Sequence, residues 1–118
     1  METGDQHELY HRAAEQGDVD AQFNLAACYE VGTGVEKDEQ KAVEWYKKAA
    51  EQGDARAQLI LALCYDYETG VEQDEQKAVE LYKKAAEQGD AKAQYNLGVC
   101  YASGNGVDKD EQNAFEWY

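Results

Sequence analysis

The sequence predicts an all-α fold, a solenoid of helix-turn-helix repeats, on three observations. Its 118 residues include no proline, and the helix-favouring residues Ala, Glu, Gln, Lys and Leu recur throughout. The string Ala-Ala-Glu-Gln-Gly-Asp begins at Ala13, Ala49 and Ala85, so the sequence repeats every 36 residues. Apolar residues inside each repeat recur at helical spacing. Such a period is typical of a solenoid, whose units bury their apolar faces against neighbouring units.

We expect residues 1–118 to form one repeat domain with about three units. Residues 1–17 read as a degenerate leading helix, and residues 18–53, 54–89 and 90–118 as repeats, of which the last is truncated. Each repeat holds a first helix, helix A, and a second helix, helix B. The chain therefore begins and ends on a helix of type B.

Helix A of the middle repeat is expected to run from about Asp54 to Asp66, with Asp54 as its N-cap. On a helical wheel its core face carries Ala57, Gln58, Leu61, Ala62 and Tyr65. A Gly-x-Gly-Val loop follows in the first and third repeats, and its glycines suit a backbone with positive φ.

Helix B is expected to begin at the N-cap Asp38 or Asp74 and to reach about Gln52 or Gln88. Its apolar arc in the first full repeat consists of Ala42, Val43, Trp45, Tyr46, Ala49 and Ala50. Small residues on both helices let them approach closely, and the large residues fill the remaining space.

The net charge and the cysteine pattern limit the partners and the compartment that we expect for the protein. The formal net charge of −14 repels phosphate backbones and anionic lipid, so neither nucleic acid nor a membrane surface is an expected partner. The longest apolar stretch is too short for a membrane span, and no signal peptide is visible. Cys28, Cys64 and Cys100 lie one repeat apart beside core tyrosines, too far apart to pair. Reduced thiols favour a cytoplasmic location.

The sequence offers little for catalysis. His7-Glu8-Leu9-Tyr10-His11 spells H-E-x-x-H, which on a helix can bind zinc, so a metal-dependent hydrolase is kept as an alternative. However, these are the only two histidines, and the segment is in phase with helix B. Ser103 is the only serine, and the glycine loops lack the lysine of a phosphate loop. We therefore expect no enzyme activity, no bound metal and no cofactor.

The face of helix A opposite the core is the candidate binding surface, because it is apolar where a solvated helix would be polar. Charged residues flank the apolar residues along it in each repeat, in the pattern of a partner site. The candidate partner-binding residues are Asp20, Phe23, Ala27, Glu30, Arg56, Leu59, Leu63, Asp66, Tyr67, Lys92, Tyr95 and Val99. The alternative is that the stacked A helices bury this face themselves.

More than a dozen positions in register give the chain a resemblance to the Sel1-like repeat, a relative of the tetratricopeptide repeat. They form the pattern Ala-x-Ala-Gln-x-x-Leu-Ala/Gly-x-x-Tyr-x-x-Gly-x-Gly-Val-x-x-Asp-x-x-Lys-Ala-x-x-Trp-Tyr-x-Lys-Ala-Ala. Glu68 departs from it at the first loop glycine, and Leu81 departs from it at the tryptophan. Secreted cysteine-rich members pair two cysteines near the phases of Ala50 and Gln58, and neither position is a cysteine here.

The resemblance implies a right-handed α/α superhelix that acts as an adaptor or scaffold for other proteins. In tetratricopeptide relatives the face of helix A that is turned away from the core lines the concave groove. The candidate surface lies on the same face. A purely architectural segment of a longer repeat protein remains an alternative.

The last helix carries Phe115, Trp117 and Tyr118 in phase with the core residues of helix B. Because terminal repeats need a polar cap, we expect either a longer array or end-to-end self-association through this helix.

Overall fold

The structure, a computed structural model, describes residues 2–107 and residue 117, and over these residues it is all-α, as predicted. Its six helices in the described part are α1 (Glu2–Glu15), α2 (Val19–Val31), α3 (Glu39–Glu51), α4 (Ala55–Tyr67), α5 (Glu75–Glu87) and α6 (Ala91–Ser103). Helices α2, α4 and α6 are the helices of type A, and α1, α3 and α5 are those of type B. The predicted bounds of both helix types are confirmed to within a residue or two.

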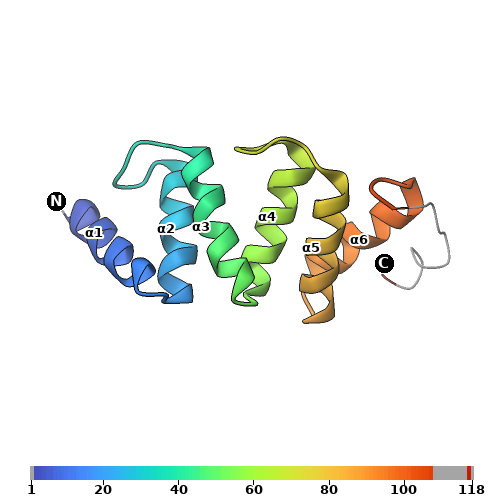
Figure 1. Ribbon diagram of the computed structural model, residues 1–118, viewed down its shortest axis with the longest axis horizontal. Helices are drawn as coiled ribbons and strands as arrows, with labels where there is room; N and C mark the ends of the chain where they lie inside the picture. The colour runs from blue at the N-terminus through green and yellow to red at the C-terminus, as the bar shows by residue number, and fades with distance from the viewer. Residues whose placement is uncertain (1, 108–116, 118) are drawn as a thin grey trace.

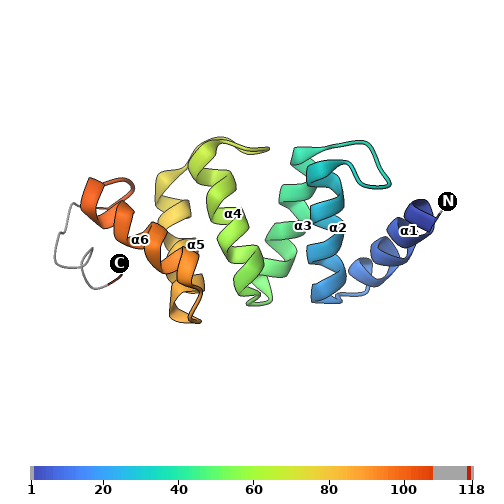
Figure 2. The same ribbon diagram turned by 180° about the vertical axis from the view of Figure 1, so that it is seen from behind.

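The helices stack side by side along one axis, from the N-terminus at one end to α6 near the other (Figure 1). The molecule measures 52 × 24 × 18 Å, as an elongated repeat array should. Short turns join α1 to α2, α3 to α4 and α5 to α6 at one edge, and the longer loops lie at the opposite edge (Figure 1). Helix α5 lies in front of α6 in Figure 1 and behind it in Figure 2, so the two helix types form two layers.

Each helix of type A begins at an aspartate that caps it. The side chains of Asp18, Asp54 and Asp90 accept hydrogen bonds from the backbone N–H three residues later, at 2.8, 3.0 and 2.9 Å. Such caps satisfy donors that the helix itself leaves unpaired. Asp38 and Asp74 do the same for α3 and α5, at 3.1 Å each.

The core follows the repeat register. Leu25, Tyr46, Tyr82 and Leu97 are the largest fully buried side chains, and Leu61 is only 4% exposed. The predicted core positions of helix B are buried except for the tryptophan phase, where Trp45 and Leu81 are half-buried. Alanines complete the core where helices approach closely.

The loop after α4 differs in sequence from its neighbours but keeps their geometry. Glu68 holds a left-handed φ of 56°, where the other repeats use Gly32 at 84° and Gly104 at 75°. A side chain there carries a conformational cost that glycine avoids. At Gly70, in the same loop, there is no room for a side chain, because a Cβ would lie 2.5 Å from the carbonyl oxygen of Glu39 on α3.

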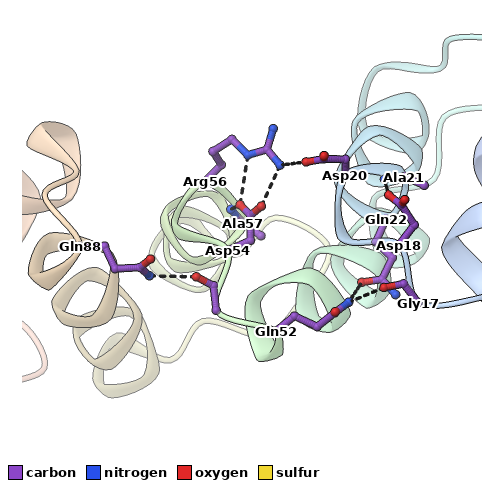
Figure 3. Close-up of polar contacts among 11 residues, drawn as sticks. Gly17, Asp18, Asp20, Ala21, Gln22, Gln52, Asp54, Arg56, Ala57 and Gln88 are labelled. Atoms are coloured by element: carbon purple, nitrogen blue, oxygen red, sulfur yellow. Dashed lines mark hydrogen bonds and ion pairs between the residues drawn. The ribbon is translucent and has the colours of Figure 1, made fainter.

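A ladder of glutamines ties successive repeats together. Buried Gln58 on α4 donates to the Ala50 carbonyl at the end of α3 and accepts from Gln88, which follows α5, at 2.9 Å. Gln52 reaches Gln22 in the same way at 2.8 Å (Figure 3). Gln22, which also donates to the Ala14 carbonyl, and Gln58 therefore each link three successive helices, as buried amides require partners.

The second helix expected in the last repeat falls on residues outside the described part of the chain, except for Trp117, which is half-buried against the core. Tyr118 and residues 108–116 are not described, so the expected self-association through this end stays a prediction. In the part of the chain that the structure describes, none of the helices has the length and apolar character to cross a membrane.

Candidate protein-binding face

The candidate binding face lies on α2, α4 and α6, on the side of each helix that turns away from the core. On α4, Leu59 and Leu63 lie opposite the core residue Leu61. Figure 2 views the molecule from the side on which the helices of type A lie in front. The residues on this face differ widely in exposure, and the contacts they make explain the differences.

Arg56 joins the first and second full repeats on this face. Its guanidinium lies 2.8 Å from a carboxylate oxygen of Asp20 on α2 and 2.7 Å from Asp54, the cap of its own helix (Figure 3). The same guanidinium lies 4.3 Å from the centre of the Phe23 ring, a cation–π contact. Phe23 also meets the buried ring of Tyr46 at 5.6 Å and is half-buried.

The carboxylate of Asp54, which caps α4, is stabilised in its charged form by its neighbours. Burial alone would raise the pKa of Asp54, but hydrogen bonds from Arg56 and from the Ala57 amide outweigh it and lower the pKa. Arg56 and Asp20 are both exposed, so their ion pair contributes little stability and orients the side chains instead. In the sequence, this pair is indicated by opposite charges at the same position of two successive repeats.

Leu59 corrects the predicted surface. It is 9% exposed and belongs to the core, whereas its repeat equivalents are half-buried Phe23 and 60% exposed Tyr95. It lies on α4, which packs against both α3 and α5. Leu59 therefore stabilises the array and offers little surface to a partner.

Two carboxylates of the predicted surface accept hydrogen bonds from buried tyrosines. Glu30 accepts a hydrogen bond from the hydroxyl of buried Tyr46 at 2.6 Å, and Asp66 accepts one from Tyr82 at 2.9 Å. Burial, reinforced by these hydrogen bonds and by the nearby carboxylate charges, raises the pKa of both tyrosines. The two acids are thus fixed at the ends of α2 and α4.

Two tyrosines of the face are largely accessible. Tyr67 is 71% exposed and Tyr95 is 60% exposed, and Lys92 is exposed beside Tyr95. The remaining predicted positions, Ala27, Leu63 and Val99, are half-buried. Val31, which shares its repeat phase with Tyr67, is likewise 69% exposed at the end of α2.

The H-E-x-x-H segment lies on α1 as a helix of type B. His7 packs edge-on against Tyr29 at 5.5 Å, and its Nδ1 is buried without a hydrogen-bond partner. Burial, helped by His11, lowers the pKa of His7. Nδ1 of His11 lies 3.4 Å from Glu15, and Glu8 is exposed. Among the described residues, His, Cys, Asp and Glu nowhere gather in threes suited to hold a metal ion.

All three cysteines are free thiols in the structure. Cys64 and Cys100 are buried, and burial raises the pKa of each to about 11. Cys28 is only half-buried, although burial raises its pKa as well. At the phases where secreted relatives are expected to hold a disulfide, Gln58 donates a hydrogen bond to the Ala50 carbonyl.

The chain belongs to the Sel1 repeat family. The family model, described as Sel1 repeat, matches residues 7–18, 19–54, 55–90 and 91–118. Sel1 repeats generally mediate protein–protein interactions. No curated protein matches the chain.

Solved structures show the same fold. A Sel1 repeat protein from Oxalobacter formigenes is 42% identical with a TM-score of 0.92 over 95% of this chain. A protective antigen of uropathogenic Escherichia coli that displays the SLR fold is 39% identical with a TM-score of 0.93, again over 95% of this chain. The chain spans only 46% and 24% of these two proteins. The cysteine-rich protein B of Helicobacter pylori is 26% identical with a TM-score of 0.69, over 93% of this chain and 78% of its own.

Proposed function

We propose that the chain is a scaffold that binds a peptide or a partner surface along the outer face of α2, α4 and α6, without chemistry of its own. The observation that carries the proposal is the exposure of Val31, Tyr67 and Tyr95 on these three helices. Exposed large apolar groups that are rimmed by charge are typical of partner sites.

The composition of the face suits a protein partner. Tyrosines supply large contact area with few rotatable bonds, and they are enriched among residues that dominate binding energy. Arg56, Asp20 and Lys92 provide a polar rim of both signs, which favours orientation over raw affinity. Because Arg56 already pairs with Asp20, this part of the rim is ordered before a partner binds.

We also propose a reducing compartment such as the cytoplasm. The support is that two of the three thiols are buried and that all three have a raised pKa, so they persist as small apolar groups. Thiol counting on protein taken from its native source tests this, and an intermolecular or intramolecular disulfide there would contradict it.

Site-specific photo-crosslinking tests the binding face. A benzoylphenylalanine residue replaces Tyr67 or Tyr95 in the protein expressed in its native cell, and the same residue at Leu9 is the control. Leu9 is 62% exposed but lies on α1, a helix of type B. We expect positions 67 and 95 to capture the same protein and position 9 not to capture it.

An equal yield of that protein from all three positions would show that the contact does not depend on the face. Capture only from position 9 would place the binding surface elsewhere and overturn the proposal.

A further inference from the structure

A pocket of about 290 Å³ lies on the other side of α4, between α3 and α5. Its apolar wall consists of Leu61 and Tyr65 from α4, with Ala50 and half-buried Leu81. Its charged rim consists of Lys47, Glu51, Lys77, Glu80 and Lys84. We call this the α3–α5 pocket. Since Leu61 and Leu63 lie on opposite sides of α4, this pocket is separate from the proposed binding face.

The preceding repeat shows what usually fills this space. There Trp45 stands at the phase of Leu81, and its ring meets the ring of His11 on α1 at 5.8 Å. Lys48 lies 5.6 Å over the same indole. One repeat later the indole is replaced by the smaller Leu81, which opens the space.

The groups that would surround an indole are nevertheless retained. Lys84 stands at the phase of Lys48, which faces the Trp45 ring, and Lys47 stands at the phase of His11. Both lysines line the α3–α5 pocket. Lys77 lies 5.6 Å over the Tyr65 ring, so the wall already holds one cation–π pair. The pocket thus combines an apolar wall with the ammonium groups of Lys47 and Lys84, which stand at the phases of the two residues that contact the Trp45 ring in the preceding repeat.

We propose that the α3–α5 pocket binds a tryptophan side chain from a partner protein segment, with acidic residues beside that tryptophan. Indole is the ring that attracts ammonium groups most strongly, and burial of an aromatic side chain supplies most of the contact area. The rim holds three lysines against two glutamates in a chain of net charge −14, so this is an unusually cationic spot. Carboxylates next to the indole complement it.

A peptide titration followed by two-dimensional amide NMR on the full chain tests this proposal. The probe is the acetylated, amidated peptide Asp-Trp-Asp, and the matched control is Asp-Leu-Asp. We expect saturable shifts at Leu61, Tyr65 and Leu81 with the tryptophan peptide. The leucine peptide should bind at least tenfold more weakly, because it lacks the ring.

Two variants and one control locate the binding. Leu81→Trp restores the residue of the preceding repeat and should keep the fold while it abolishes peptide binding. Lys84→Gln should weaken binding about three- to tenfold through loss of the cation–π contact. Lys83→Gln makes the same charge change at an exposed neighbour outside the pocket and should bind as wild type does.

Three results would overturn the proposal. These are the absence of saturable shifts in the wild type, unchanged binding by Leu81→Trp, and pocket shifts that follow the concentration of the protein alone. The last result would make a second copy of the chain the occupant. Substitution of Tyr67 and Tyr95 on the proposed face of α2, α4 and α6 should leave this titration unchanged. Either proposal can therefore fail without the other.

Discussion

Replacement of Gln58 by methionine should weaken the whole array, because this residue ties three helices together. Gln58 is 4% exposed, donates to the Ala50 carbonyl at 3.3 Å and accepts from Gln88 at 2.9 Å. Methionine has a similar shape but makes neither bond. Each lost hydrogen bond costs roughly 0.5–1.5 kcal/mol net, so we expect a loss of about 2 kcal/mol in unfolding free energy.

A larger loss is not expected, because both partners keep another bond. The Ala50 carbonyl still accepts from the Gly53 amide at 2.9 Å, and Gln88 still donates to the Gly53 carbonyl at 3.0 Å. Neither group therefore incurs the full penalty of a buried unpaired atom.

Gln94→Met is the matched control for this substitution. Gln94 has the same phase but is half-buried, and its one hydrogen bond within the described residues goes to the Ala86 carbonyl at 3.1 Å. It should cost about 1 kcal/mol. Urea unfolding followed by far-UV circular dichroism measures both, at unchanged m-value. Equal costs for the two variants, or no cost for Gln58→Met, would show that Gln58 does not tie the three helices together.

Three further predictions follow from local features. Glu68→Gly should raise the unfolding free energy by about 1 kcal/mol in thermal melts, because glycine adopts the observed φ of 56° without a Cβ penalty; a lower melting temperature would contradict this. The raised pKa values of Tyr46 and Tyr82 mean that the folded state holds their protons when the unfolded chain loses them. The contribution of these two tyrosines to stability should therefore be intact below about pH 10 and fall above it by about 1.4 kcal/mol per pH unit for each tyrosine, and their joint replacement by phenylalanine should remove this contribution. Cys28 should react with a thiol reagent before the two buried cysteines, and peptide mapping that finds equal labelling of the native protein would exclude the observed difference in burial.

Much of the fold could be predicted because the relevant signals are local and recur every 36 residues. The cap Asp54 and the core residue Leu61 follow from residue type, helical phase and repetition. The burial of Leu59 could not be predicted in this way, because Phe23 at the same phase is half-buried and Tyr95 is exposed. Exposure at this phase depends on how many neighbours each repeat has and on what they contribute.

The candidate site was predicted as a face but not as a set of contacts. Opposite charges at the phase of Asp20 and Arg56 allowed the ion pair, yet the stacking of Arg56 on Phe23 depends on the distance between neighbouring helices of type A. Likewise, Leu81 was visible in the sequence as a departure from tryptophan. Only the arrangement of α3, α4 and α5 shows that, among the described residues, the space beside Leu81 stays open as a pocket.

The most direct test of the proposed binding face is the affinity of the crosslinked partner for variants of that face, measured by isothermal titration calorimetry. The double variant Tyr67→Ser/Tyr95→Ser should bind at least tenfold more weakly than wild type, since exposed tyrosines at an interface centre contribute strongly to binding. Leu9→Ser, which removes an equally exposed apolar group from α1, should change the affinity less than twofold. Wild-type affinity for the double variant, with its melting temperature unchanged, would contradict the claim that this protein binds its partner through the face of α2, α4 and α6.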